Sequence, residues 1–74
     1  MDIRLARAAE ALINHFGGQV PAAEAVGVSQ PTISSWCRGK HGAKPKNARR
    51  AESATNGVVK AVDLCRELEE IDIA

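Results

Sequence analysis

The chain has 74 residues and a formal net charge of +1, from ten basic and nine acidic side chains. This length predicts one domain over residues 1–74, and so small a domain hides only about 60% of the surface of its unfolded chain. Hydrophobic residues make up 45% and charged residues 26%, which excludes a disordered tail. The small core leaves no room for a buried cofactor, so we expect none.

Targeting signals are missing from the sequence pattern. No apolar run is long enough to span a membrane, and residues 1–12 carry charges inside their apolar pattern, unlike a signal peptide. We therefore expect a cytoplasmic protein. In that reducing compartment Cys37 and Cys65 are expected to be free thiols.

The first two predicted helices lie before residue 27. Apolar residues at spacings of four, three and four predict a helix over 3–16, ended by the Gly17-Gly18 pair. The residues that share its apolar face are Leu5, Ala9, Leu12 and Phe16. An alanine-rich segment predicts a second helix over about 19–26, with Pro21 in its first turn.

Three further helices are expected. Ser29 as the N-cap and Pro31 near the first helical position predict a third helix over 30–38. After a loop, a fourth helix is expected from about Pro45 to Thr55. Apolar residues spaced three, four and three apart predict a fifth helix over about 60–71. The sequence leaves residues 58–60 open among helix, loop and strand.

The second and third predicted helices have the pattern of a helix-turn-helix over about 19–38. Gly27 permits the positive φ that the sharp turn needs. Small or apolar residues occupy the positions where the helices must pack: Ala22, Ala23, Val26, Val28, Ile33 and Trp36. Trp36 lies three residues from Ile33, so we interpret it as a core residue and not as a platform for stacking bases. The opposite face of the third helix is left for a partner.

At Gln19, Ala23, Gly27, Val28, Ser29 and Trp36 the sequence resembles the Cro repressors of lambdoid phages, especially their all-helical branch and Cro-like prophage regulators. The likeness covers about residues 11–64 and returns more weakly in AESATNG at 51–57. It implies an all-α, five-helix, lambda-repressor-like domain in a bacterial host. It also implies a dimer that represses phage promoters by binding double-stranded operator DNA. Two positions depart from the pattern: Ala51, where a larger aliphatic residue is expected, and Lys60, where Thr or Ser often caps the fifth helix.

Basic residues are concentrated in one segment. Six of the ten lie between residues 38 and 50, with no acid among them: Arg38, Lys40, Lys44, Lys46, Arg49 and Arg50. The rest of the chain contains four basic residues and all nine acids, so its formal net charge is −5. Because phosphates attract the positive segment and repel the acidic C-terminal end, we expect the segment to face DNA.

Polar residues on the third helix and around it are candidates for DNA contact. Gln can bind adenine through two hydrogen bonds, and small serines permit close approach to bases. The candidates for base readout are Gln30, Pro31, Ser34, Ser35 and Arg38, of which Arg38 either reads guanine or holds a phosphate. The candidates for backbone contact are Gln19, Ser29, Thr32, Lys40, His41, Lys44, Lys46, Asn47 and Arg49. Gln19 stands at a helix N-terminus, where free N–H groups favour phosphate. The resemblance implies that it also braces the first residue of the third helix.

The C-terminal third contains a candidate homodimer interface. A stripe there is more apolar than so small a core readily hides: Val58, Val59, Ala61, Leu64 and Leu68. We expect a weak dimer through residues 55–70, strengthened by operator DNA. The alternative is that the stripe only closes the monomer's own core.

Other functional classes have less support. His15, Cys37, His41 and Cys65 lack the paired spacing of zinc ligands, and no nucleophile motif is present. We therefore expect no metal site, no enzyme and no small-molecule substrate. Two alternatives to a repressor stay open. One is a phage activator or DNA-packaging subunit with the same motif, and the other is a protein-interaction or toxin module that uses the fold without binding DNA.

Overall fold

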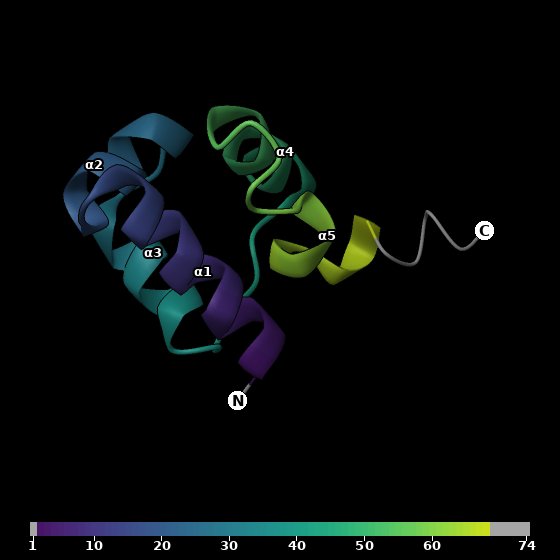
Figure 1. Cartoon of the computed structure of the whole chain (residues 1–74). Helices are drawn as coiled ribbons and strands as arrows, with labels where there is room; N and C mark the ends of the chain where they lie inside the picture. Colours follow the sequence, from purple (N-terminus) through teal and green to yellow (C-terminus); the bar gives the residue numbers. More distant parts are fainter. Residues whose placement is uncertain (1, 69–74) are drawn as a thin grey trace.

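In the computed structural model, which describes residues 2–68, the chain is all helical, as predicted. Its helices are α1 (Ile3–Phe16), α2 (Gln19–Val26), α3 (Gln30–Cys37), α4 (Pro45–Ala54) and α5 (Ala61–Leu64). Helices α1, α2 and α3 pack together, while α4 and α5 form the other side of the domain (Figure 1). Within the described range there is no strand, and residues 58–60 form a connector that is neither helix nor strand.

The ends of the first three helices follow from local chemistry. Asp2 is the N-cap of α1, since its Oδ1 accepts a hydrogen bond from the Leu5 N–H at 3.2 Å. Gly27 has a φ of +84°, the left-handed conformation predicted for the turn before α3. Ser29 precedes α3 as expected, but its hydroxyl pairs with the Thr32 hydroxyl at 2.9 Å instead of capping a backbone N–H. Arg38 lies just beyond the last residue of α3, so that helix ends one residue earlier than predicted.

The core lies where the helices meet. Its largest fully buried side chains include Leu12 from α1, Val26 from α2 and Ile33 from α3. Trp36 is only 2% exposed, which confirms that it packs in the core. Burying one such side chain contributes about 1.5–3 kcal/mol. The buried face of α3 therefore fixes which of its side chains point outward.

Thr55 is the C-cap of α4, which ends at Ala54, one residue earlier than predicted. It is fully buried. Its hydroxyl donates to the carbonyl oxygen of Ala51 at 2.9 Å and accepts from the Val59 N–H at 3.1 Å. These two bonds satisfy the hydroxyl and hold the connector against the end of α4. Ala51, where a larger side chain was expected, has no exposed surface.

The start of α5 is capped from another helix. Lys60 occupies the N-cap position and its side chain makes no capping bond. Instead, Oε1 of Glu52 in α4 accepts a hydrogen bond from the Ala61 N–H at 2.7 Å. Glu52 therefore satisfies the first free N–H of α5, although a Ser or Thr at residue 60 would accept from the second or third, and its charge also suits a helix N-terminus.

The prediction of one continuous helix over 60–71 is wrong. Helix α5 ends at Leu64 because Cys65 is extended, with φ −139° and ψ 107°, and residues 66–68 are helical again. The Leu64 carbonyl accepts the N–H of Ala43 at 2.8 Å, so the loop before α4 takes the group that would continue the helix. Residues 69–71 of the predicted helix lie outside the described range.

Four of the five residues in the predicted apolar stripe are buried in the chain's own core, which is the alternative that the sequence left open. Helix α5 packs against both α1 and α4, so it closes the chain's own core. Each of these four residues is at most 6% exposed: Val59, Ala61, Leu64 and Leu68. Val58 differs, because 65% of it is exposed. Within the described range, no helix combines the length and hydrophobicity needed to cross a bilayer.

Candidate nucleic-acid interface

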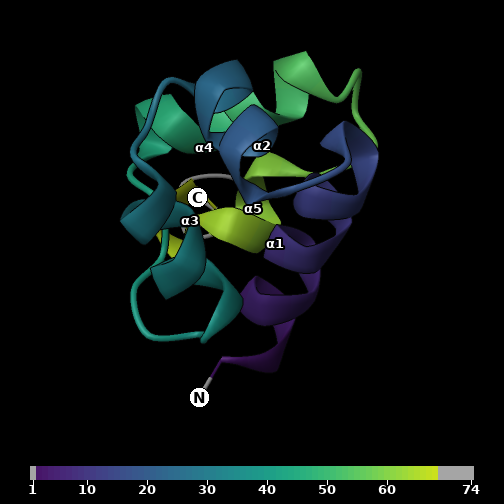
Figure 2. The same ribbon diagram turned by 90° about the vertical axis from the view of Figure 1, so that its left-hand side faces the viewer.

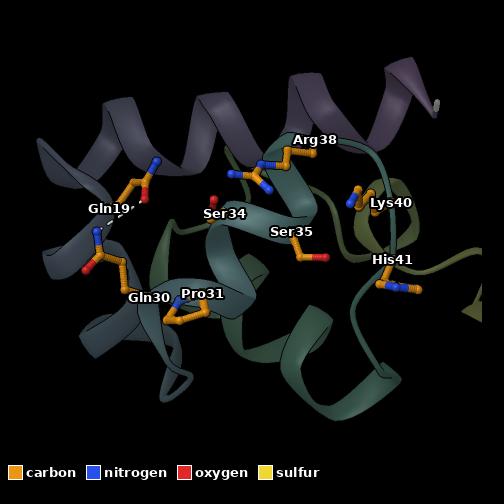
Figure 3. A pocket seen from close by; sticks show the side chains of 8 residues that line it. All are labelled: Gln19, Gln30, Pro31, Ser34, Ser35, Arg38, Lys40 and His41. Carbon is orange, nitrogen blue, oxygen red and sulfur yellow. Dashed lines mark hydrogen bonds between the residues drawn. The ribbon is translucent and has the colours of Figure 1, made fainter.

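An open hollow of about 550 Å³ lies along α3 and the residues that follow it. It is lined by Gln19, Gln30, Pro31, Ser34, Ser35, Arg38, Lys40 and His41. These side chains lie on one face of the domain (Figure 3). Figure 2 turns α2 and α3 toward the viewer, with α5 behind them. The structure therefore brings all five predicted readout residues together with three of the predicted backbone contacts.

Two glutamines from different helices meet at one end of this hollow. Nε2 of Gln30 donates to Oε1 of Gln19 across 3.4 Å (Figure 3). This is the bracing that the resemblance implied between the start of α2 and the start of α3. One N–H of the Gln30 amide is engaged, which leaves its oxygen and its second N–H free. In the major groove adenine presents one donor, N6–H, and one acceptor, N7, so these two free groups of the Gln30 amide can bind it.

A second hollow adjoins the first at the N-terminus of α4. Its lining includes Thr32, His41, Lys44 and Asn47, all predicted to contact the DNA backbone. Pro31, Ser35 and His41 line both hollows, so the two form one surface. No side chain caps the α4 N-terminus, whose N–H groups and dipole favour an anion.

The charges on this surface are all of one sign. Neither hollow is lined by a carboxylate. Within residues 2–68 two ion pairs lie elsewhere: Arg4 Nε in α1 is 2.6 Å from Asp63 Oδ1 in α5, and Arg66 Nε beyond α5 is 3.4 Å from Oδ2 of the N-cap Asp2. Among residues 2–68, none of the six basic residues between 38 and 50 forms an ion pair. Their charge is therefore available to a polyanion.

Three predicted backbone contacts lie outside both hollows. Ser29 is exposed at the start of α3, and Lys46 and Arg49 are exposed on α4. Arg50 has a different surrounding, since its Nη1 lies 3.2 Å from where a Cβ on Gly27 would stand. Its guanidinium therefore packs over the turn between α2 and α3.

Sequence reasoning missed Ile3. This residue is 60% exposed and lines a groove with Val58, between α1 and the connector before α5. Ile3 and Leu5 are two residues apart, so they point to nearly opposite sides of α1. This spacing alone places Ile3 outside the buried stripe of α1. Of the large hydrophobic residues exposed in the described range, Ile3 and Val58 share this groove, whereas Val20 lies outside it on α2.

Neither thiol resembles a reactive site. Burial raises the pKa of the Cys37 thiol, and the negative charge of Glu10 raises that pKa further. Cys37 therefore stays protonated at neutral pH, the form that is neither a nucleophile nor a metal ligand. Cys65 is buried. Across the described residues, no three side chains of the metal-binding types come together.

Comparison with known proteins covers most of the chain. A family model described as "Bacterial toxin YdaS" matches residues 9–71. "Regulatory protein cro" of Pseudomonas phage D3 is 50% identical over 54 residues, which cover 73% of this chain and 74% of that relative. The chain belongs to the Cro-like YdaS family. No solved structure matches it significantly.

Membership in the Cro-like YdaS family confirms the resemblance drawn at the helix-turn-helix residues. The family match over residues 9–71 includes α2 to α5, and therefore both hollows. It also includes Val58, though not Ile3. The Cro relative is a regulatory protein by name.

Proposed function

We propose that this protein is a transcriptional repressor that binds operator DNA with α3 in the major groove. The main support is that the exposed side of α3 and a set of unpaired cations form one surface. Neither of its hollows is lined by a carboxylate. A helix in the major groove must present hydrogen-bonding groups to bases and cations to phosphates, and this surface presents both. The similarity to a phage Cro regulator supports the same role.

The residues divide by the part of DNA that each one meets. Gln30 reads adenine, the two serines allow close approach, and the exposed Pro31 ring suits a thymine methyl group. Arg38, at the end of α3, holds a phosphate. The other backbone contacts are Gln19, Ser29, Thr32, Lys40, His41, Lys44, Lys46, Asn47 and Arg49. Occupying the operator would then block RNA polymerase.

A homodimer completes the proposal. One short helix in one major groove covers few base pairs, which discriminates poorly against the many competing sites of a genome. A two-fold dimer doubles the contacts and reads half-sites about 34 Å apart. The exposed Ile3 and Val58 side chains provide its apolar contact, since the rest of the expected stripe is buried.

Selection of binding sites from a random duplex pool tests the proposal. We expect enrichment of a palindrome whose half-sites lie about one helical turn apart. The selected site, placed in a promoter reporter, should lower expression, whereas an activator would raise it. A pool that enriches no sequence, from protein shown to be folded, would rule out specific operator binding.

The family description favours a second candidate, a toxin directed at the bacterial host. A toxin that acts on a host protein does not need the α3 surface, whereas a repressor does. Expression of the Gln30→Ala and Lys44→Ala double variant separates the two. Growth inhibition that persists after DNA binding is lost would support the toxin.

A further inference from the structure

The loop between α3 and α4 carries basic side chains but is held by distant parts of the chain. Near its start, the Gly39 carbonyl accepts the N–H of Asp2 at 3.2 Å. Near its end, the N–H of Ala43 donates to the Leu64 carbonyl at 2.8 Å. The position of this loop is therefore set by the N-terminus and by α5, besides the two helices that it connects.

Gly42 lies next to the hydrogen bond between Ala43 and Leu64 and leaves no room for a side chain toward α5. A Cβ at this residue would lie 2.9 Å from the Leu64 carbonyl oxygen, closer than real Cβ contacts come. Unlike the other glycines, Gly42 has no positive φ, so space and not backbone conformation requires glycine here. The Leu64 carbonyl is available to the loop because the extended Cys65 ends α5 at that residue.

The two loop cations, Lys40 and Lys44, flank Gly42 along the chain, and both are exposed, as is His41. A Cβ would have to retreat from 2.9 Å to at least 3.4 Å to reach ordinary contact with the carbonyl. That shift, about 0.5 Å, matches the tolerance to which binding groups must be held. It would move the loop cations relative to α3, while Gln30 stays on its helix.

We propose that Gly42 is a positioning residue for the DNA-backbone contacts of this loop, acting through the Leu64 carbonyl. The inference rests on the proposed function and adds to it, since it assigns a role to a residue that has no side chain with which to contact DNA. The close packing of Gly42 on α5 places the loop cations opposite phosphates. Base readout by α3 is independent of this contact.

Gly42→Ala in the full chain tests the inference, with Ala54→Gly as a control that weakens α4 away from the loop. Affinity is measured on the selected site and on random duplex, from about 50 to about 200 mM salt. Each lost phosphate contact flattens the slope of log affinity against log salt by about 0.9. We expect Gly42→Ala to flatten it by about one to two and to leave the ratio of the two affinities unchanged. The control should keep the parent slope.

A parent slope in folded Gly42→Ala would overturn the inference and leave the proposed function standing. Equal affinity losses in Gly42→Ala and the control, with unchanged slopes, would show a purely structural role and overturn it too. A parent chain that binds no duplex would instead defeat the proposed function. If Gly42→Ala does not fold, Ala43→Pro replaces it, because proline lacks the N–H that donates to Leu64. The same flattening is expected there, and an unchanged slope again overturns the inference.

Discussion

Replacing Gln30 by alanine tests base readout without disturbing the fold. Within residues 2–68, its side chain makes one hydrogen bond, the 3.4 Å contact with Gln19, which is long and exposed to water. Losing such a bond costs little stability, so a loss of affinity reports the contact with DNA. A bidentate amide–adenine pair contributes about 1–3 kcal/mol of discrimination. Gln30→Ala should therefore weaken binding to the selected site by about 5- to 150-fold.

Fluorescence anisotropy on two labelled duplexes, the selected site and a random sequence, measures this effect. Gln30→Ala should lose affinity for the selected site and little for random DNA. Lys44→Ala is the matched control, because an exposed loop cation that meets a phosphate should weaken both about equally. Equal losses on both duplexes from both variants would show that the recognition face is misassigned.

A double-mutant cycle extends the test to the residue that braces Gln30. If Gln19 orients the Gln30 amide, Gln19→Ala should cost more affinity in the parent than in the Gln30→Ala background. The remaining cost in that background is the contact of Gln19 with the DNA backbone. Strictly additive losses would mean that the 3.4 Å hydrogen bond has no part in readout.

Three further predictions concern stability, assembly and reactivity. Thr55→Val leaves the buried Val59 N–H without an acceptor, so it should lower the free energy of unfolding by about 1–3 kcal/mol and the melting temperature by roughly 5–20 °C. Thr55→Ser keeps the hydroxyl and should not have this effect, and an unchanged melting curve for Thr55→Val would contradict the prediction. Val58→Asp should weaken binding to a palindromic site more than to a single half-site, and equal effects would argue against an interface at this residue. Glu10→Gln should shift alkylation of Cys37 by iodoacetamide to lower pH, because the Glu10 charge raises the thiol pKa, and identical rate–pH profiles would count against that cause.

Most of the fold is predictable from the sequence because its signals are local. Helices α1 and α2 begin and end as their apolar spacing and flanking glycines predict. The break in α5 has no such signal, since Cys65 lies in a run of good helix formers. At the break, the Leu64 carbonyl instead accepts the N–H of Ala43, which is far away in sequence. A contact made by another segment cannot be derived from the periodicity of the helix itself.

The candidate site was predicted more fully than the dimer surface. Helix periodicity alone places the two serines and Arg38 away from the buried Ile33 and Trp36. Gln30 is three residues before Ile33, and it is exposed as the first residue of α3. How much apolar surface α5 leaves exposed depends instead on how it packs between α1 and α4, which composition does not reveal. The proposed role of Gly42 also depends on packing, because its φ is not positive and its backbone conformation therefore does not require glycine.

The salt dependence of binding to bulk duplex tests the central claim most directly. Five exposed cations stand on or beside the surface of α3: Arg38, Lys40, Lys44, Lys46 and Arg49. At about 0.9 per phosphate contact, they predict a slope of about −4 to −5 per chain for log affinity against log salt. A steep slope near that value on random DNA is the predicted result. Affinity that stays flat with salt, or no binding to any duplex at low salt, would contradict the account.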